Sequence, residues 1–398
     1  MKRFSRSSLT TMAVCLLFIP ALLKAQPRPA HRKKVGVVLS GGGAKGMAHI
    51  GVLKVIEKAG IPIDYVVGTS MGSIIGGLYS IGYSPEQLDS MVRRQDWTFL
   101  LSDKIPRSEQ NLSERDASQK YVFSIPFGKG VKAEVFGGLI RGQNLANLFS
   151  ELTIGYHDSI NFNKLPIPFA CVSENIVNGN EVNFHEGVLA TAMRASMAIP
   201  GVFTPVRLDS MVLVDGGVVN NYPVNVARAM GADLIIGVDV QSELKPAGEL
   251  NSAGAILGQL VNLMGQDLYK KNLKETTTYI KVNVEGYSAA SFTPSAIDTL
   301  IMRGEEAAMA QDSALMALKS QLGLDSTYMP QPIPSYPYSP ERKVYVKEIT
   351  FDGIDEKDKK WLLKRCDLKE NSEISIRRIE EATAILSANL GYSGATHS

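Results

Sequence analysis

The sequence has few of the residues that build a metal site or a disulfide framework. Its 398 residues include three cysteines and five histidines. Cys15 lies within an N-terminal apolar run, and Cys171 and Cys366 are far apart along the chain. None of these cysteines has the spacing of a metal-binding or disulfide motif. The sequence therefore predicts neither a cysteine-based metal site nor a fold held together by disulfide bonds.

Strong charge of one sign and a long hydrophobic run are also missing. The chain has 42 basic and 40 acidic residues and no basic block, so we expect no nucleic-acid partner. The apolar run from about Leu9 to Leu23 is shorter than the roughly 20 residues that cross a bilayer. Because Lys2, Arg3 and Arg6 precede it and Ala25 follows it, we interpret residues 1–25 as a signal peptide. A retained membrane anchor is the alternative. We expect an exported protein: periplasmic, associated with the outer membrane, or secreted.

From residue 34 to residue 322 the pattern alternates between short aliphatic runs and helical stretches. This alternation predicts an α/β fold, with a mainly parallel sheet covered by helices on both faces. The expected strands are Val35–Leu39, Tyr65–Val67, Ile167–Val172, Met211–Val214, Leu234–Val240 and Thr278–Val284. The expected helices are Met47–Ala59, Gly72–Ser80, one that begins at the capping box Ser84–Gln87, Val188–Ala195, Val224–Met230, Leu257–Lys270 and Ser295–Leu322.

The regular pattern breaks down between about Gln95 and Gly130. This polar, irregular stretch carries Trp97, Phe99, Leu100 and Leu101 close together. Long irregular segments in compact domains are often lids or binding loops. Burial of the aromatic cluster in the core is at least as good an interpretation as contact with a membrane.

A proline-rich stretch marks a boundary near the C-terminus. Residues 325–342 contain five prolines and are typical of a semi-rigid linker. The following residues, 343–398, predict one strand at Val344–Phe351 and helices at Lys357–Arg365 and Ile374–Ala388. One strand cannot bury a sheet face by itself, so we expect a small, incomplete α+β module.

The first candidate functional motif is the glycine loop Gly41-Gly42-Gly43-Ala44-Lys45-Gly46, placed between a strand and a helix. Glycines allow a tight turn that points bare N–H groups at an anion. The loop also fits the dinucleotide fingerprint, which demands an acidic residue at the end of the second strand. Asp64 precedes that strand instead, so nucleotide binding is disfavoured.

At the end of the second strand the sequence has Gly68-Thr69-Ser70-Met71-Gly72. A Gly-x-Ser-x-Gly turn between a strand and a helix exposes the serine hydroxyl for attack on a carbonyl carbon. A purely structural turn is the alternative. The strand before and the helix after favour Ser70 as a nucleophile.

The third motif, Asp215-Gly216-Gly217, directly follows the strand Met211–Val214. We therefore expect Asp215 at the carboxyl edge of the sheet, where the sites of open α/β sheets form. The two glycines keep the turn small enough for the carboxylate to reach Ser70. A solvated turn aspartate is the alternative.

The chain offers no well-placed histidine for a serine triad. Only His397 follows Asp215, and it belongs to the C-terminal module; His49, on the helix after the glycine loop, is expected to be packed or exposed. This leaves a Ser70–Asp215 dyad with a carboxylate base, whose ordinary pKa near 3.9 makes it weak at neutral pH. Much of the catalysis then falls to an oxyanion hole, with the N–H groups of Gly42 and Gly43 as natural donors.

Together with the run Arg194–Phe203, these three motifs resemble the patatin-like phospholipase family. The resemblance covers about residues 34–322 and implies a three-layer α/β/α fold with a Ser70–Asp215 dyad. It implies an oxyanion hole around Gly41, Gly42 and Gly43, supported by the motif glycines Gly46, Gly68, Gly72, Gly216 and Gly217. The implied activity is hydrolysis of acyl esters in phospholipids or other lipids, without a metal or cofactor and at a membrane surface. An acyltransferase on the same fold is the first alternative.

The C-terminal residues resemble the opening half of a POTRA domain. In one bacterial, exported branch of the family, this module joins the patatin domain to the outer membrane. The resemblance implies that a protein partner can dock on residues 343–398. A non-catalytic, outer-membrane-associated interaction protein is therefore the second alternative function.

Overall fold

The computed structural model describes residues 32–103, 138–251, 256, 258–259, 263–333, 341–350 and 356–382. The expected signal peptide, residues 1–25, lies outside these ranges. So do residues 104–137, which make up much of the expected irregular segment, residues 334–340 of the expected linker and residues 383–398 of the C-terminal module. No helix among the described residues is both long and apolar enough to span a membrane.

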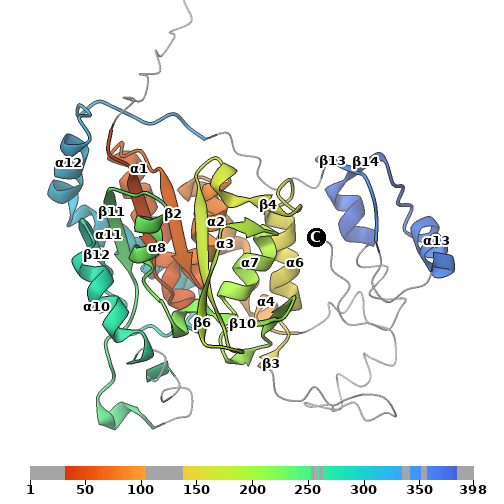
Figure 1. The fold of residues 1–398 in the computed structure, drawn as a ribbon, viewed down its shortest axis with the longest axis horizontal. Coiled ribbons are helices and arrows are strands. Elements are labelled where there is room, and N and C mark those ends of the chain that lie inside the picture. The colour runs from red at the N-terminus through yellow and green to blue at the C-terminus, as the bar shows by residue number, and fades with distance from the viewer. Residues whose placement is uncertain are drawn as a thin grey trace, which may run out of the picture. The chain divides into compact units, whose positions relative to one another are not determined.

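The described part of the chain contains one large mixed sheet of eight strands (Figure 1). Strands β12, β11, β1, β2 and β5 run parallel, whereas β10, β9 and β6 join them in antiparallel pairs. The sheet is therefore mainly parallel, as predicted. In order across the sheet the strands are β12 (Thr278–Lys281), β11 (Leu234–Asp239), β1 (Val35–Leu39), β2 (Tyr65–Thr69), β5 (Phe169–Asn175), β10 (Met211–Asp215) and β9 (Val206–Leu208), with β6 (Asn180–Phe184) also paired to β5.

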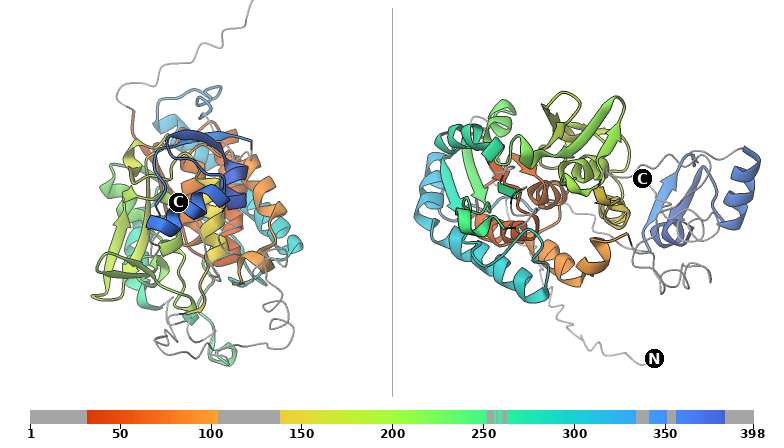
Figure 2. Two further views of the ribbon diagram at one scale, coloured as in Figure 1. Left: turned by 90° about the vertical axis from the view of Figure 1, so that its right-hand side faces the viewer. Right: turned by 90° about the horizontal axis from the view of Figure 1, so that it is seen from below.

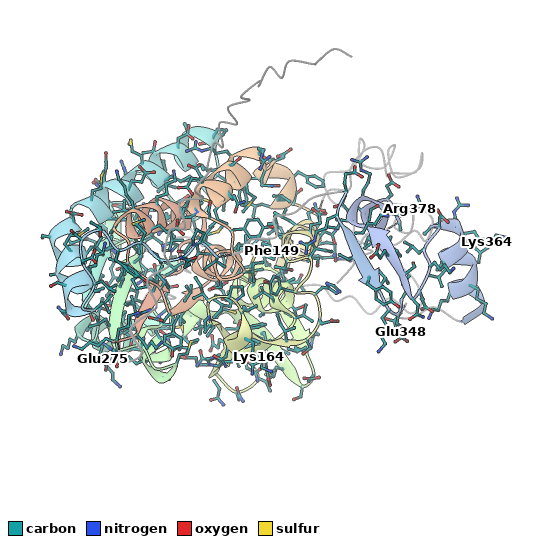
Figure 3. All side chains as sticks on the ribbon, turned by 90° about the horizontal axis from the view of Figure 1, so that it is seen from above. Phe149, Lys164, Glu275, Glu348, Lys364 and Arg378 are labelled. Carbon is teal, nitrogen blue, oxygen red and sulfur yellow. The ribbon has the colours of Figure 1, made fainter. Side chains whose placement is uncertain are left out.

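Helices cover both faces of this sheet (Figure 2). Successive strand residues point to opposite faces, so Val37 and Leu39 of β1 enter a large core while Val38 enters a smaller one. The larger core is closed by α1 (Ala48–Lys58), α2 (Met71–Ser80), α3 (Pro85–Arg94), α7 (Leu189–Ser196), α11 (Pro294–Met309) and α12 (Asp312–Gln321), and the smaller by α8 (Val224–Ala229) and α10 (Gln266–Lys274). The three-layer α/β/α prediction is confirmed. Figure 3 shows the side chains that fill these layers, including the buried Phe149.

Several local predictions can be compared with the structure. Ser84 and Gln87 form the expected reciprocal capping box at the start of α3. The single helix expected over Ser295–Leu322 is instead two, α11 and α12, with a turn between them. The break could not be seen in the sequence, because both helices bury leucines in the same core and the apolar pattern runs on across it. The remaining short elements are α4 (Trp97–Leu100), α6 (Gln143–Leu152), η1 (Gly43–Met47), η2 (Phe162–Lys164), η3 (Gly216–Val218), η4 (Ala247–Glu249), and the strand pairs β3 (Gly138–Ile140) with β8 (Gly201–Phe203) and β4 (Ile160–Asn161) with β7 (Glu186–Gly187).

The aromatic cluster after Gln95 packs into the core. Trp97 and Leu100 are buried on α4, and Phe99 and Leu101 pack against the same core. The Trp97 indole N–H donates to the Val92 carbonyl, which satisfies its polar group. For these four residues, the packing interpretation holds.

The C-terminal module has one more strand than predicted. Strand β13 (Lys343–Val346) pairs in antiparallel fashion with β14 (Ser372–Ser375), and α13 (Glu356–Arg365) lies between them in sequence. The expected helix at Ile374–Ala388 begins later, because residues 372–375 belong to β14 and residues 376–382 are helical. The start of this helix was predicted too early because Ile374 and Ile376 are both buried, although Ile374 belongs to a strand and Ile376 to a helix.

Asp64, which precedes β2 and so misses the position that the dinucleotide fingerprint requires, has a structural role. Asp64 accepts two hydrogen bonds from the buried Arg32 guanidinium, at 2.6 and 2.7 Å, and one from the Val35 N–H at 2.9 Å. These contacts lie at the amino ends of β1 and β2, at the opposite edge of the sheet from the glycine loop. Asp64 therefore has no access to a ligand bound at that loop.

Candidate active site

Ser70 sits on a strained turn between β2 and α2. Its φ of 55° and ψ of −125° lie in a region that non-glycine residues rarely adopt, which is characteristic of functional turns. The flanking glycines make the turn possible. A Cβ on Gly68 would lie 2.3 Å from the Gly72 carbonyl oxygen, and one on Gly72 would lie 2.2 Å from the Leu39 carbonyl oxygen. The predicted strand–serine–helix arrangement is present.

Two neighbouring hydroxyls hold the Ser70 backbone in place. The Ser70 N–H donates to Ser196 Oγ at 3.0 Å, and Ser196 Oγ donates to the Val172 carbonyl at 2.6 Å. On the other side, Ser73 Oγ donates to the Ser70 carbonyl at 2.6 Å. Sequence reasoning gave no role to Ser196, although it lies in the run Arg194–Phe203 that carried the family resemblance.

Asp215 reaches Ser70 by a different route from the one expected. Its strand, β10, runs antiparallel to β5, so Asp215 does not end a parallel strand as the sequence suggested. Strand β5 continues past the end of β2, and β10 pairs with this extension until Asp215 lies opposite Ser173. The carboxylate thus arrives level with the turn that follows Thr69. The predicted direction of this strand was therefore wrong. Asp215 nevertheless lies beside the carboxyl edge of the parallel strands, where it was expected.

The two side chains are in direct contact, because Ser70 Oγ donates to Asp215 Oδ2 at 2.6 Å. The other oxygen, Oδ1, accepts the Gly217 N–H at 2.7 Å. Gly216 has no room for a side chain, since a Cβ there would lie 2.2 Å from the Val172 carbonyl oxygen, and one on Gly217 would lie 3.0 Å from Asp215 Oδ1. The two glycines therefore allow the short turn that aims the carboxylate.

Burial changes the acidity of Asp215. Loss of solvent raises its pKa to about 6, although the hydrogen bonds from Ser70 and Gly217 act in the opposite direction. Asp215 is therefore a stronger base than a carboxylate with the ordinary pKa would be. A carboxylate with a pKa nearer neutrality is a better acceptor for the serine proton.

The glycine loop contributes two free donors rather than three. The Gly41 N–H is already bonded to Asn221, through its carbonyl at 3.2 Å and its side-chain oxygen at 3.1 Å. Within the described residues, the N–H groups of Gly42 and Gly43 have no partner. Gly43 has a φ of +57° and packs against Ala289. Of the three glycines expected at the oxyanion hole, only Gly42 and Gly43 therefore have an N–H available. The hydrogen bonds of Gly41 hold the loop in position instead.

The loop is fixed to the rest of the site by close packing. A Cβ on Gly46 would lie 2.4 Å from Met71 Cγ, so this glycine lets η1 rest directly on the residue after Ser70. Asn221 connects Gly41 to Gln241, to which its amide N–H donates at 2.9 Å. No sequence signal pointed to Asn221, because it lies in a loop outside the three motifs.

No histidine in the described part of the chain completes a triad with Ser70 and Asp215. His49 is fully buried, and its Nε2–H donates to the Ser40 carbonyl at 2.8 Å. Burial lowers its pKa to about 4, so the ring is neutral and supports the strand before the glycine loop. His31 and His397 lie outside the described residues. Within the described part of the chain, no group of three or more His, Cys, Asp or Glu side chains is arranged to hold a metal ion.

A buried charge cluster adjoins the loop. Lys45 donates to Ser242 Oγ at 2.8 Å, and its pKa falls to about 8 because of burial and the nearby Lys281. Asp239, at the end of β11, accepts hydrogen bonds from Lys281 and from the hydroxyls of Tyr269 and Tyr279. Lys281, the Gln241 N–H and the Tyr279 hydroxyl hold the pKa of Asp239 below its usual value despite burial. This cluster fastens the ends of β11 and β12 beside the glycine loop.

Comparisons with known proteins show which proteins this chain resembles. Residues 37–228 match the family model described as Patatin-like phospholipase. The chain is 31% identical over 221 residues to Lysophospholipase NTE1 of Candida albicans, covering 54% of this chain and 14% of the relative. It is 32% identical over 211 residues to Patatin-like phospholipase domain-containing protein 6 of Mus musculus, covering 52% and 14%.

One further curated relative and one solved structure are also similar to this chain. An uncharacterised NTE family protein of Mycobacterium bovis is 29% identical over 230 residues, covering 58% of this chain and 55% of the relative. The crystal structure of VipD from Legionella pneumophila matches 72% of this chain at 17% identity, with a TM-score of 0.38, too low to add to the sequence match. This chain thus spans between about one seventh and about one half of these curated relatives. Within it, residues 37–228 carry the similarity to the patatin-like phospholipase family.

Proposed function

We propose that this domain hydrolyses the acyl esters of lipids, with phospholipids or lysophospholipids as substrates. The 2.6 Å contact between Ser70 Oγ and Asp215 Oδ2, beside two unoccupied N–H groups, carries this proposal. The family match and the lysophospholipase name of one relative support the lipid substrate. The proposed chemistry needs no metal or cofactor.

The residues can perform both halves of the reaction. Ser70 Oγ attacks the ester carbonyl carbon while Asp215 accepts its proton, and the N–H groups of Gly42 and Gly43 stabilise the oxyanion. The proton then passes from Asp215 to the departing alcohol, which leaves an acyl-Ser70. Water attacks this ester, Asp215 takes the proton of the water, and Ser70 recovers it as the fatty acid departs.

The role of Ser70 is tested with a fluorophosphonate probe, which reacts covalently with activated serines. We expect labelling of the wild type and none of Ser70→Ala, together with a loss of hydrolysis on the order of a thousandfold or more. Ser80→Ala is a matched control, since Ser80 lies at the other end of α2 and its buried hydroxyl has no hydrogen-bond partner among the described residues. Equal labelling of Ser70→Ala and the wild type would rule out Ser70 as the nucleophile.

The raised pKa of Asp215 predicts the pH dependence of hydrolysis. Only the ionised carboxylate accepts the serine proton, so kcat/KM for a soluble ester is expected to rise about tenfold per pH unit below pH 6 and to level off above it. The rate of fluorophosphonate labelling should follow the same curve, because it reports Ser70 attack alone. A profile that stays flat down to about pH 4.5 contradicts a base with this pKa.

Acyl transfer to an acceptor other than water would use the same acyl-Ser70 and is the rival activity. Products formed with and without an added alcohol distinguish hydrolysis from transfer.

We also propose that the chain is exported, which the basic residues before the run Leu9–Leu23 support, and that residues 343–398 dock a protein partner. N-terminal sequencing of the mature protein tests the first of these wider proposals, and pull-down with residues 343–398 deleted tests the second.

A further inference from the structure

Exposed large apolar side chains gather at one edge of the catalytic domain. Ile176 and Val177, in the turn between β5 and β6, are 51% and 64% exposed. In the segment between β11 and α10, residues 240–265, four more are between 44% and 67% exposed. We refer to these six side chains as the apolar rim: Ile176, Val177, Leu244, Ile256, Leu263 and Met264.

The sheet topology places the two parts of the rim on either side of the candidate site. Strands β1 and β2, which lead into the glycine loop and Ser70, lie between β11 and β5. All four strands are parallel, so their carboxyl ends share one edge. The β11–α10 segment leaves that edge on one side, at the lower left in Figure 1, and the β5–β6 turn extends past it on the other.

Specific contacts tie the β11–α10 segment to the catalytic elements. At its start, Gln241 accepts from Asn221 and Ser242 accepts from Lys45 of the glycine loop. At its end, a Cβ on Gly265 would lie 3.7 Å from the Val219 carbonyl oxygen, just after the η3 turn that follows Asp215. The exposed Leu263 and Met264 directly precede this point. The start of the segment is therefore bonded to the catalytic elements, and its end lies near the turn that follows Asp215.

Five of the six rim residues lie in stretches without charge, whereas Leu244 lies between Glu243 and Lys245. Between Glu249 and Asp267 the sequence has no ionisable residue, and neither does the turn from Asn175 to Asn180. Lys245 pairs with Glu249 on the same segment. A surface of this kind matches the uncharged acyl layer of a bilayer better than an anionic headgroup surface, where lysine or arginine clusters are expected.

We propose that the apolar rim inserts into the surface of a lipid bilayer and places the Ser70 site against it. This inference rests on the proposed function, because a water-insoluble ester must leave its bilayer to reach Ser70. Insertion on both sides of the site would shorten that path. Since the interaction depends on apolar burial, it is expected to be insensitive to salt and to the content of anionic lipid.

The test is flotation of the full chain with phosphatidylcholine vesicles, using Ser70→Ala so that no substrate is consumed. Two double variants remove the two parts of the rim: Ile176→Ser with Val177→Ser, and Leu263→Ser with Met264→Ser. Each is expected to weaken vesicle binding about tenfold or more, from the apolar area that no longer inserts. A matched control replaces Met302 and Met309 of α11, which are 50% and 55% exposed on the helical layer.

Further measurements separate the possible outcomes. Hydrolysis of a soluble short-chain ester should be unchanged in both rim variants, whereas hydrolysis of vesicle lipid should fall with binding. Equal loss in the α11 control, or binding that vanishes in high salt, overturns the inference. So does a rim that instead mediates self-association, seen as a concentration-dependent dimer that the rim variants abolish. If vesicles bind through the rim but no ester is cleaved, the proposed function fails while the inference stands.

Discussion

Asp215→Asn is expected to lower kcat for ester hydrolysis by a factor on the order of 10⁴ or more while it stabilises the folded protein. Asparagine occupies the same volume and can still accept the Gly217 N–H, but it cannot take the Ser70 proton. In triads, where the aspartate only orients a histidine, the comparable change already costs about 10⁴. Here the described residues place no histidine at Ser70, so the carboxylate is the sole base in the proposed mechanism. Steady-state kinetics on a soluble ester measure the loss.

The gain in stability follows from the pKa of Asp215. This pKa is raised to about 6 in the folded protein from its ordinary value of 3.8. A raised pKa contributes stability below pH 3.8 that is lost as the pH rises through 6, because the buried group must then ionise. At about 1.4 kcal/mol per pH unit, the cost at neutral pH is about 3 kcal/mol. The uncharged asparagine carries no such cost, so the Tm of the variant should exceed that of the wild type by several degrees at about pH 7.

Two observations would contradict this assignment. One is substantial hydrolysis by Asp215→Asn, provided that the variant is intact. The change places asparagine before Gly216, and Asn–Gly sequences deamidate to aspartate, so mass spectrometry must accompany the assay and Asp215→Ala serves as a second variant. The other is a Tm difference that does not grow between about pH 4 and about pH 7.

Much of the site could be predicted because its chemistry is local in sequence. Gly68, Ser70 and Gly72 occupy one turn, and the strand before it and the helix after it leave the serine few alternatives. The capping box at Ser84 and Gln87 is equally local. In both cases the backbone geometry is set by close neighbours in the chain, which a pattern in the sequence can record.

What could not be predicted depends on contacts between distant segments. The antiparallel entry of β10 is set by its pairing with the end of β5, much earlier in the chain. The partner of the Gly41 N–H is Asn221, 180 positions along the chain. The partner of the Ser70 N–H is Ser196, 126 positions along the chain. The pKa of Asp215 results from burial under all of these segments. No pattern within a single strand or helix encodes such effects.

Gly72→Ala is expected to destabilise the catalytic domain by about 3 kcal/mol or more and to impair hydrolysis. An added Cβ would lie 2.2 Å from the Leu39 carbonyl oxygen and 2.7 Å from that of Ser40. Both are backbone atoms of the strand that leads into the glycine loop, so relief requires α2 and β1 to separate. Overpacking of side chains typically costs about 1–3 kcal/mol, and a clash between backbones has fewer ways to relax. Thermal and urea unfolding measure the change.

A matched control exists in the same helix. A Cβ on Gly77 would meet Met193 Sδ at 2.8 Å, the flexible end of a side chain that can adopt another rotamer. Both substitutions gain about 1 kcal/mol of helix propensity, so their difference isolates the contact. Gly77→Ala should stay within about 1 kcal/mol of the wild type and keep its activity. Equal stability of the two variants would mean that the close approach of α2 to β1 is not what holds Ser70 in its strained turn.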